Sequence, residues 1–122
     1  MGEYAPIYDE GESIPVTLSG TVTGGQLLVV SGASTVAASS AANAKSVGVA
    51  LFDGVSGDRI TMAGRGPVHR LTASGTVTAG DAVEPAAAGA VATHTVGTND
   101  AYVFGVALTT ATTGNPVEIM EV

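Results

Sequence analysis

Short runs in which hydrophobic and polar positions alternate dominate this chain. In residues 14–19, Ile14, Val16 and Leu18 share one face, which is the two-residue period of a half-buried β-strand. Pro15 has no N–H to donate to a neighbouring strand, so this strand is predicted to lie at the edge of a sheet.

Further short strands are predicted along the rest of the chain. Residues 26–31 contain the continuous apolar run L-L-V-V, which is typical of a strand buried on both faces. Similar patterns predict strands over residues 35–37, 45–52, 58–63, 67–71, 81–85, 90–93, 101–108 and 115–121. Two alanine-rich segments, residues 37–44 and 86–88, favour either a short helical turn or a loop, and we expect mostly loop.

The chain contains an internal repeat. The segment S-G-T-V-T-G-G-Q at residues 19–26 recurs as S-G-T-V-T-A-G-D at residues 74–81, an offset of 55 positions. Two further matches have an offset of 57: G-V-A-L at residues 48–51 with 105–108, and residues 57–62 with 114–119. Biased composition alone hardly gives three matches in the same order. The chain is therefore predicted to be built from two similar β-units.

The predicted organisation is an extended N-terminal arm, residues 1–13, followed by a single β domain, residues 14–122. The repeat halves of this domain span approximately residues 14–64 and 65–122. The arm is acidic and has no hydrophobic period, whereas the domain is rich in the glycine, threonine and valine that favour strands and tight turns. The predicted fold class is all-β.

The core available to this domain is thin. Hydrophobic residues make up 45% of the chain, but aromatic residues make up only 4%, and there is no tryptophan. Burial of a large apolar side chain contributes roughly 1.5–3 kcal/mol, and alanine contributes much less. We therefore expect part of the apolar surface to be buried between subunits, where association adds stability.

The charge of the chain argues against two classes of partner. A net charge of −7 disfavours nucleic acid, whose backbone repels an acidic surface, and it equally disfavours anionic membranes. No stretch approaches the roughly 20 apolar residues of a membrane-spanning helix. The four basic residues all lie between positions 45 and 70: Lys45, Arg59, Arg65 and Arg70. They form either a local contact zone or a set of scattered solubilising charges.

Residues for catalysis or metal binding do not occur in a recognisable pattern. There is no cysteine, which excludes disulfides, zinc–thiolate sites and cysteine nucleophiles. His69 and His94 have no second ligand at metal-binding spacing, so structural or surface roles are expected for both. The segment G-V-S-G at residues 54–57 departs from the G-x-S-x-G spacing of a serine nucleophile. We expect no enzyme activity, no cofactor and no metal.

Several stretches together form a pattern that covers nearly the whole chain from about Tyr8 onward. They are residues 14–26 with the turn T-G-G-Q, V-G-V-A-L-F-D at 47–53, residues 56–58, G-P-V-H-R-L-T-A-S-G at 66–75, and residues 105–108 with Gly114 and residues 117–119. On these stretches the sequence resembles the small head decoration, or capsid cement, proteins of tailed phages, particularly phages of actinobacteria. The resemblance implies a compact β-barrel-like or β-tulip domain.

The resemblance also implies a function. Such proteins form homotrimers on the outer surface of the capsid at three-fold and quasi-three-fold positions, where they clamp adjacent major capsid protein subunits. The arm is expected to reach across subunits. The expected capsid or inter-subunit contacts are Tyr4, Pro6, Ile7 and Tyr8 of the arm, and Arg59, Arg65 and Arg70 of the basic segment. The family supplies no catalytic residues.

Two other function classes stay open on the sequence. A carbohydrate-binding surface module, which would recognise a host-surface glycan, usually needs exposed aromatic platforms, and Tyr102 and Phe104 are expected in the core. Another virion structural protein, from the tail or connector, would also be all-β and oligomeric. A ring symmetry other than three-fold would favour that alternative.

Overall fold

The computed structural model describes residues 13–64 and 68–121, and this part of the protein is all-β, as predicted. Apart from Ser13, the predicted N-terminal arm lies outside the described residues. The strands are β1 (Ser13–Leu18), β2 (Leu27–Gly32), β3 (Thr35–Ala38), β4 (Ser46–Ala50), β5 (Arg59–Ala63), β6 (Val68–Thr72), β7 (Ala82–Pro85), β8 (Val91–Thr93), β9 (Gly105–Ala107) and β10 (Pro116–Glu121). Two short 3-10 segments are η1 (Ala87–Gly89) and η2 (Asp100–Tyr102). No helix in the described residues has the length and apolar character to cross a membrane.

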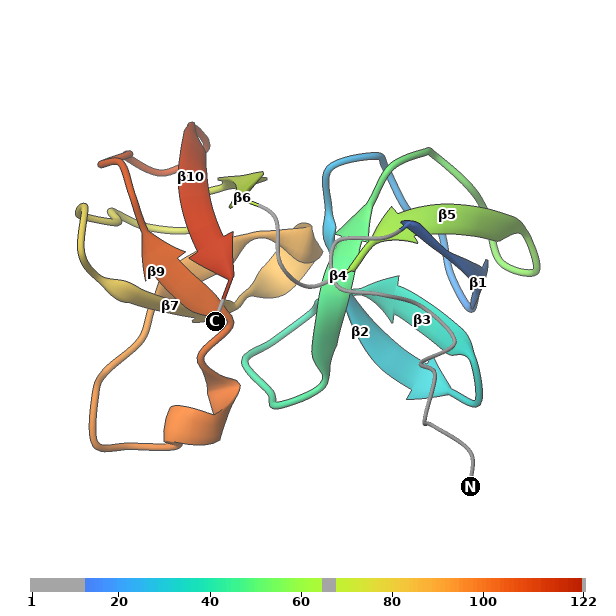
Figure 1. Cartoon of the computed structure of the whole chain (residues 1–122), viewed down its shortest axis with the longest axis horizontal. Coiled ribbons are helices and arrows are strands. Elements are labelled where there is room, and N and C mark those ends of the chain that lie inside the picture. Colours follow the sequence, from blue (N-terminus) through green and yellow to red (C-terminus); the bar gives the residue numbers. More distant parts are fainter. Residues whose placement is uncertain (1–12, 65–67, 122) are drawn as a thin grey trace, which may run out of the picture.

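The strands form two sheets of the same topology, which lie side by side (Figure 1). In the first, the order is β1-β3-β2-β4-β5, and pairing of β5 with β1 closes a barrel. In the second, the order is β6-β10-β9-β7-β8, which is the same order once β6 is matched to β1 and β10 to β5. A parallel bridge between Ala73 and Val91 stands where Leu18 pairs with Val36. We call residues 13–63 the first unit and residues 68–121 the second unit.

The internal duplication extends to individual backbone hydrogen bonds. Val22 and Gly54 exchange two N–H···O bonds of 2.8 and 2.9 Å in the first unit. Val77 and Ala111 exchange two bonds of 2.9 and 2.8 Å in the second. These pairs are related by the offsets of 55 and 57 positions read from the sequence. The sequence repeat therefore matches equivalent residues in the two units, and these paired hydrogen bonds confirm the predicted duplication.

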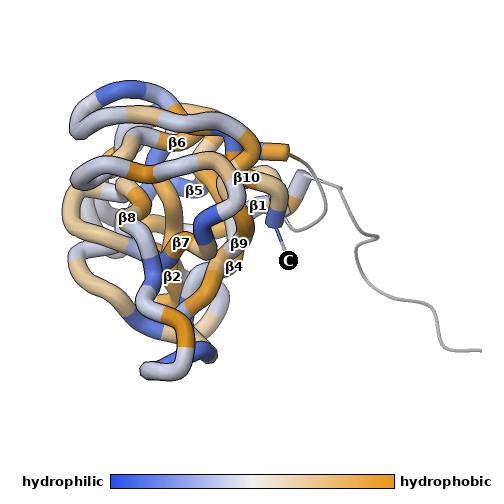
Figure 2. The backbone as a smooth tube through the Cα atoms, turned by 90° about the vertical axis from the view of Figure 1, so that its left-hand side faces the viewer, coloured by the Kyte–Doolittle hydropathy of each residue, from blue (hydrophilic) through white to orange (hydrophobic). Residues whose placement is uncertain are grey.

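Each unit has its own core, and β2 lies between the two cores. Hydrophobic positions recur along the strands of both units (Figure 2). Leu28 packs in the core of the first unit, whereas its neighbour Leu27 packs in the core of the second unit with Val83 and Phe104. Both leucines are fully buried. This arrangement explains the continuous apolar run of β2, because its two faces serve two cores.

Hydrogen bonds reinforce the contact between the units at η1. The buried Ser39 hydroxyl donates to the Ala86 carbonyl at 2.7 Å, and the Gln26 side-chain amide donates to the Ala88 carbonyl at 3.0 Å. The approach is close, since a Cβ on Gly89 would lie 2.4 Å from the Cβ of Gln26. Gly89 also has a φ of +68°, which glycine adopts without strain. The two units are therefore joined by specific polar contacts as well as by apolar packing.

The prediction of a strand over residues 101–108 is wrong in its first half. The 3-10 segment η2 ends at Tyr102, and β9 spans only Gly105–Ala107. The physical reason is that the Asp100 carboxylate is hydrogen-bonded to the His94 side chain and to the Gly97 N–H, which holds Asp100 in a turn. Phe104 is fully buried, as expected for a core residue, whereas Tyr102 is only half-buried.

Pro15 and the alanine-rich segments also refine the prediction. The strand β1 lies inside a closed barrel rather than at a sheet edge, but it pairs with β3 only at Thr17 and Leu18. Pro15 lies in the half of β1 that has a neighbour on one side only, so its missing N–H disrupts no ladder on the other. Residues 39–45 form a loop, as expected, and residues 86–88 overlap η1.

Candidate docking surfaces

The loop between β4 and β5, residues 51–58, exposes three apolar side chains. Leu51 is 46% exposed, Phe52 is 59% exposed and Val55 is 55% exposed. Single exposed apolar residues are common on soluble proteins, but several gathered on one loop are typical of a surface that contacts another protein. We call these three residues the apolar loop cluster.

Hydrogen bonds hold this loop in one conformation. The Asp53 carboxylate accepts the Gly24 N–H at 2.7 Å, and the Asp58 carboxylate accepts the Val55 N–H at 2.9 Å. Gly54 between them is fixed by its two backbone bonds to β1–β2 loop residue Val22. A loop that is already ordered loses little conformational entropy when it binds, which favours affinity.

The equivalent loop of the second unit lacks two of these apolar side chains. By the offset of 57, Phe52 corresponds to Thr109 and Val55 corresponds to Thr112. The second loop forms the matching backbone pair at Ala111 with threonine at both positions. The loop conformation therefore does not need Phe52 or Val55, and their exposed apolar surface is available for binding.

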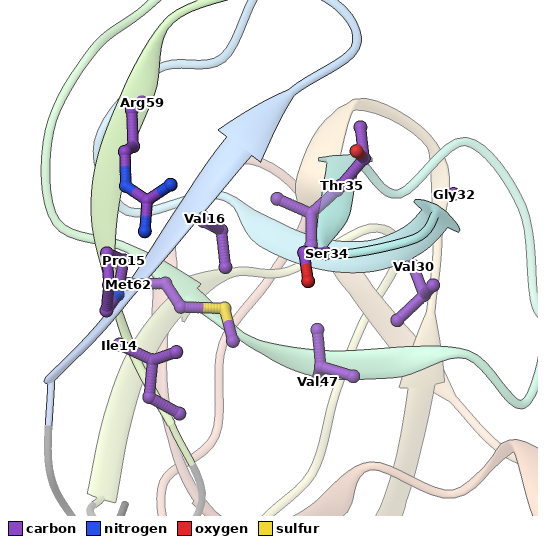
Figure 3. Close-up of a pocket in the computed structure, with 11 residues that line it drawn as sticks. Ile14, Pro15, Val16, Val30, Gly32, Ser34, Thr35, Val47, Arg59 and Met62 are labelled. Carbon is purple, nitrogen blue, oxygen red and sulfur yellow. The ribbon is translucent and has the colours of Figure 1, made fainter. Parts of the chain in front are cut away.

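A pocket of about 330 Å³ opens between the first half of β1 and the β2–β3 hairpin (Figure 3). It exists because β1 and β3 pair at only two positions and diverge toward the start of β1. Its apolar lining is Ile14, Pro15, Val16, Val30, Val36, Val47 and Met62. Arg59 of β5 also lines the pocket, and in Figure 3 its guanidinium points from the strand toward this opening.

Two of the predicted contact residues can be placed in the structure. Arg59 begins β5 in the first unit, and Arg70 lies on β6 in the second unit, so the two are carried by different sheets. The Arg70 guanidinium lies 3.8 Å from the Glu118 carboxylate, and both side chains are well exposed. The remaining predicted contacts, Tyr4, Pro6, Ile7, Tyr8 and Arg65, lie outside the described residues.

The side chain of His94 is buried between two carboxylates. Its Nδ1 lies 2.5 Å from Glu84 Oε1 on β7, and its Nε2 lies 2.9 Å from Asp100 Oδ1 on η2. Ionised carboxylates only accept hydrogen bonds, so both ring nitrogens carry a proton when both partners are ionised. We call this arrangement the His94 clasp. It ties η2 to the β7–β8 hairpin, and Asp100 further accepts the Gly97 N–H at 2.8 Å.

The clasp shifts the pKa values of His94 and Asp100 in opposite directions. The hydrogen bond to Asp100, followed by the hydrogen bond to Glu84, raises the pKa of His94 above its usual 6.5, against the opposing effect of burial. The hydrogen bond from His94, with that from the Gly97 N–H, lowers the pKa of Asp100 below its usual 3.8. Both shifts favour the charged forms.

The second histidine, His69, is also a buried residue of the second unit. Its ring centroid lies 6.0 Å from that of Phe104, and its Nε2 lies 3.5 Å from Glu121 Oε2. Within residues 13–64 and 68–121, no three histidine or carboxylate side chains are arranged to hold a metal ion. Both histidines are buried in the second unit.

The protein is therefore a duplicated all-β domain whose surface carries a rigid apolar loop and an open apolar pocket. The family model described as phage cement protein matches residues 8–120, and the chain belongs to this family. The resemblance read from the sequence is therefore confirmed. Membership gives the protein a capsid-associated structural role in a bacteriophage.

A solved structure shares this fold. The crystal structure of the head fiber gp8.5 N base in bacteriophage phi29 matches with a TM-score of 0.67 and 21% sequence identity. The match covers 91% of this chain and 93% of that chain. At this identity the likeness shows the fold. No curated protein sequence matches the chain.

The apolar loop cluster is not anticipated from the sequence analysis, which predicts strands over residues 45–52 and 58–63 and names none of the three residues as a contact. A signal is nevertheless present. Alignment of the repeats at G-V-A-L sets Phe52 against Thr109, and an apolar residue facing a polar one in a duplicated loop marks a position that folding alone does not fix. The same alignment sets Val47 against Phe104, so the two units also differ at this position.

Proposed function

We propose that this protein is a capsid decoration protein that binds the outer surface of a phage head at three-fold and quasi-three-fold positions. It acts as a homotrimer, and it stabilises the shell by clamping adjacent major capsid protein subunits. Its role is structural and involves no catalysis. This proposal extends the capsid-associated role that family membership gives.

The observation that carries the proposal is the apolar loop cluster. Leu51, Phe52 and Val55 stand exposed on a loop that is held by hydrogen bonds, and the duplicate loop folds without the last two. Apolar anchors on a rigid support are the residues that dominate the energy of protein–protein contacts. Many identical copies on one shell add avidity, so each single contact can be modest.

The residues of the N-terminal arm and the basic segment supply further contacts in this proposal. Tyr4, Pro6, Ile7 and Tyr8 bring apolar side chains that can anchor the arm on a neighbouring subunit. The arginines supply electrostatic attraction to an acidic capsid surface, which guides association more than it sets affinity. These arginines are Arg59, Arg65 and Arg70.

The test is an add-back assay with expanded capsids that lack the protein. Purified protein is mixed with capsids, the capsids are pelleted, and bound copies are counted per capsid subunit. We expect saturation at about one trimer per three-fold position, because avidity and symmetry both favour that stoichiometry. Sedimentation equilibrium of the free protein measures whether it is a trimer.

A matched pair of variants tests the role of the apolar loop cluster. The double variant Phe52→Thr and Val55→Thr copies the second unit, so it is expected to fold normally. Loss of two apolar anchors should weaken capsid binding more than about tenfold, since each buried anchor contributes roughly 1.5–3 kcal/mol. The control Val96→Thr removes a valine that is 78% exposed in the second unit and should bind like the wild type.

Other outcomes point to the other function classes. Absence of binding to capsids, together with binding to purified tails or connectors, would replace the proposal with a tail or connector role. Binding to host-surface glycans in an array, without binding to capsids, would replace it with a carbohydrate-binding role. Equal binding by the threonine double variant and the wild type would remove the apolar loop cluster from the contact.

A further inference from the structure

The two units differ at one core position that controls how well each is filled. By the offset of 57, Val47 at the second position of β4 corresponds to Phe104, which directly precedes β9. Phe104 is fully buried in the core of the second unit. Val47 is only partly buried, and it lines the open pocket of the first unit. The smaller side chain leaves space where the sister unit holds an aromatic ring.

A neighbouring position follows the same relationship. By the offset of 55, Ile14 corresponds to His69, and the His69 ring packs near the Phe104 ring in the second unit. In the first unit Ile14 and Val47 line the same pocket (Figure 3), and neither is fully buried. The pocket of the first unit therefore lies where the second unit holds an aromatic ring, and the first unit has no aromatic side chain of its own at that position.

We infer that this pocket receives a tyrosine side chain from the N-terminal segment, residues 1–12, of a second copy of the chain. The inference rests on the proposed homotrimer and identifies the receptor for its arm. Open apolar space in a protein core costs contacts and stability, and an incoming ring restores what Phe104 provides in the second unit.

The chemistry of the segment matches the pocket. Residues 1–12 contain Tyr4 and Tyr8, so they supply the chain's aromatic side chains other than Phe52, Tyr102 and Phe104. The segment also carries four acidic residues: Glu3, Asp9, Glu10 and Glu12. Arg59 at the pocket provides the complementary charge. Twelve residues in extended form reach about 40 Å, which spans the distance to an adjacent small domain.

The geometry of β1 favours a second copy over the same chain as the source. On the β5 side of β1, the Leu18 N–H donates to the Asp58 carbonyl. On the pocket side, the Thr17 N–H donates to the Ser34 carbonyl. Because sides alternate along a strand, the nitrogen of Pro15 also faces the pocket side, where it has no hydrogen to donate. A chain that turned back after Ser13 and paired along β1 would need that donor. A segment that arrives from a neighbouring copy needs no reversal and can enter the pocket without pairing along β1.

The test is photo-crosslinking of the full chain in solution, without capsids. The photoreactive residue p-benzoylphenylalanine replaces Tyr4 in one protein and Tyr8 in another, which retains an aromatic ring at each position. After irradiation, denaturing gels separate covalent dimers from single chains, and mass spectrometry locates the linked residue. We expect covalent dimers from one of the two positions, joined at Met62 or Val30 of the pocket.

A second substitution in the same proteins fills the pocket from inside. Val47→Phe copies the second unit and should reduce the covalent dimers about tenfold or more, the effect of losing one well-buried anchor. Val68→Phe adds the same side chain at an exposed position of β6, and should leave the yield unchanged. If Val47→Phe proves unfolded by circular dichroism, Arg59→Glu is the substitute, because it sets an acidic side chain against an acidic segment.

Three results would overturn the inference: links confined within single chains, links outside the pocket, or dimers that persist in Val47→Phe. Failure of this inference is distinct from failure of the proposed function, since the assay contains no capsid. A protein that saturates capsids but forms no pocket links keeps its proposed function and refutes the pocket. A protein that forms the pocket links but does not bind capsids refutes the proposed function and keeps the inference about the pocket.

Discussion

Gly48 and Gly105 stand at the same position of the two units, and each faces the backbone of the neighbouring strand. A Cβ on Gly48 would lie 2.3 Å from the Ala63 carbonyl oxygen, and a Cβ on Gly105 would lie 2.3 Å from the Met120 carbonyl oxygen. Neither contact can relax by moving a flexible side chain, because both partners are backbone atoms. The close approach between β4 and its partner β5 is therefore repeated between β9 and β10, and both positions require glycine.

Alanine at either glycine should consequently destabilise the protein. We expect Gly48→Ala and Gly105→Ala each to lower the free energy of unfolding by about 1–3 kcal/mol, the usual cost of forcing extra atoms into packed structure. Urea unfolding followed by circular dichroism measures this. Gly20→Ala is the matched control, because a Cβ there would meet no atom within 4 Å. Equal stability of the three variants would contradict the close approach of the two strand pairs at these glycines.

One of the contacts that join the two units is made by a buried hydroxyl. Ser39 donates to the Ala86 carbonyl at 2.7 Å from a fully buried position. Ser39→Ala should lower the free energy of unfolding by about 1 kcal/mol, the net worth of one intramolecular hydrogen bond. The neighbouring Ser40 is exposed, so Ser40→Ala in the same urea titration should match the wild type. A Ser39→Ala protein as stable as the wild type would show that this bond adds nothing to the joint.

Much of the fold could be predicted from the sequence, because strand patterns and repeats are local signals. The alternation of Ile14, Val16 and Leu18 locates β1, and the run around Leu28 identifies a strand with two buried faces. The closure of the first unit could not be predicted in this way. It requires β1 to pair with β5 and also, in parallel, with β3 at Leu18 and Val36, and no local pattern states which distant strands will pair.

The candidate surfaces were less accessible to prediction for a related reason. The pocket arises from what Val47 lacks by comparison with Phe104, so it becomes visible only when the two units are superposed. The His94 clasp joins β7, the end of β8 and η2, and its residues have no recognised spacing in the chain. Its hold on Asp100 explains why a helical turn replaces the strand predicted there.

The arginines of the basic segment are predicted to act through charge. Replacing Arg59, Arg65 and Arg70 together by alanine should lower capsid occupancy at low salt in the add-back assay. The difference from the wild type should shrink at high salt, because mobile ions screen exposed charges. Folding stability should change by less than about 1 kcal/mol, since the ion pair of Arg70 with Glu118 is exposed. Unchanged occupancy at every salt concentration would remove the basic residues from the contact.

The His94 clasp predicts a specific dependence of stability on pH. Since the pKa of His94 is raised in the folded protein, its contribution is fully present below its unfolded value of 6.5 and is lost as the pH rises through the folded pKa. Since the pKa of Asp100 is lowered, its contribution is present above 3.8 and is lost as the pH falls through the folded pKa. The clasp is therefore strongest in the mildly acidic range between these two values.

The variant His94→Gln, which cannot take up charge, isolates this effect. We expect its unfolding midpoint in urea to fall furthest below that of the wild type near pH 5, and the gap to narrow steadily toward pH 8. Comparing the two proteins at each pH cancels the titration of groups that do not interact with His94. Glu84→Gln should give a gap of the same sign and smaller size, because Asp100 still pairs with His94 in that variant. A gap that stayed constant from pH 5 to pH 8 would mean that His94 is held by packing alone and carries no charge in the clasp.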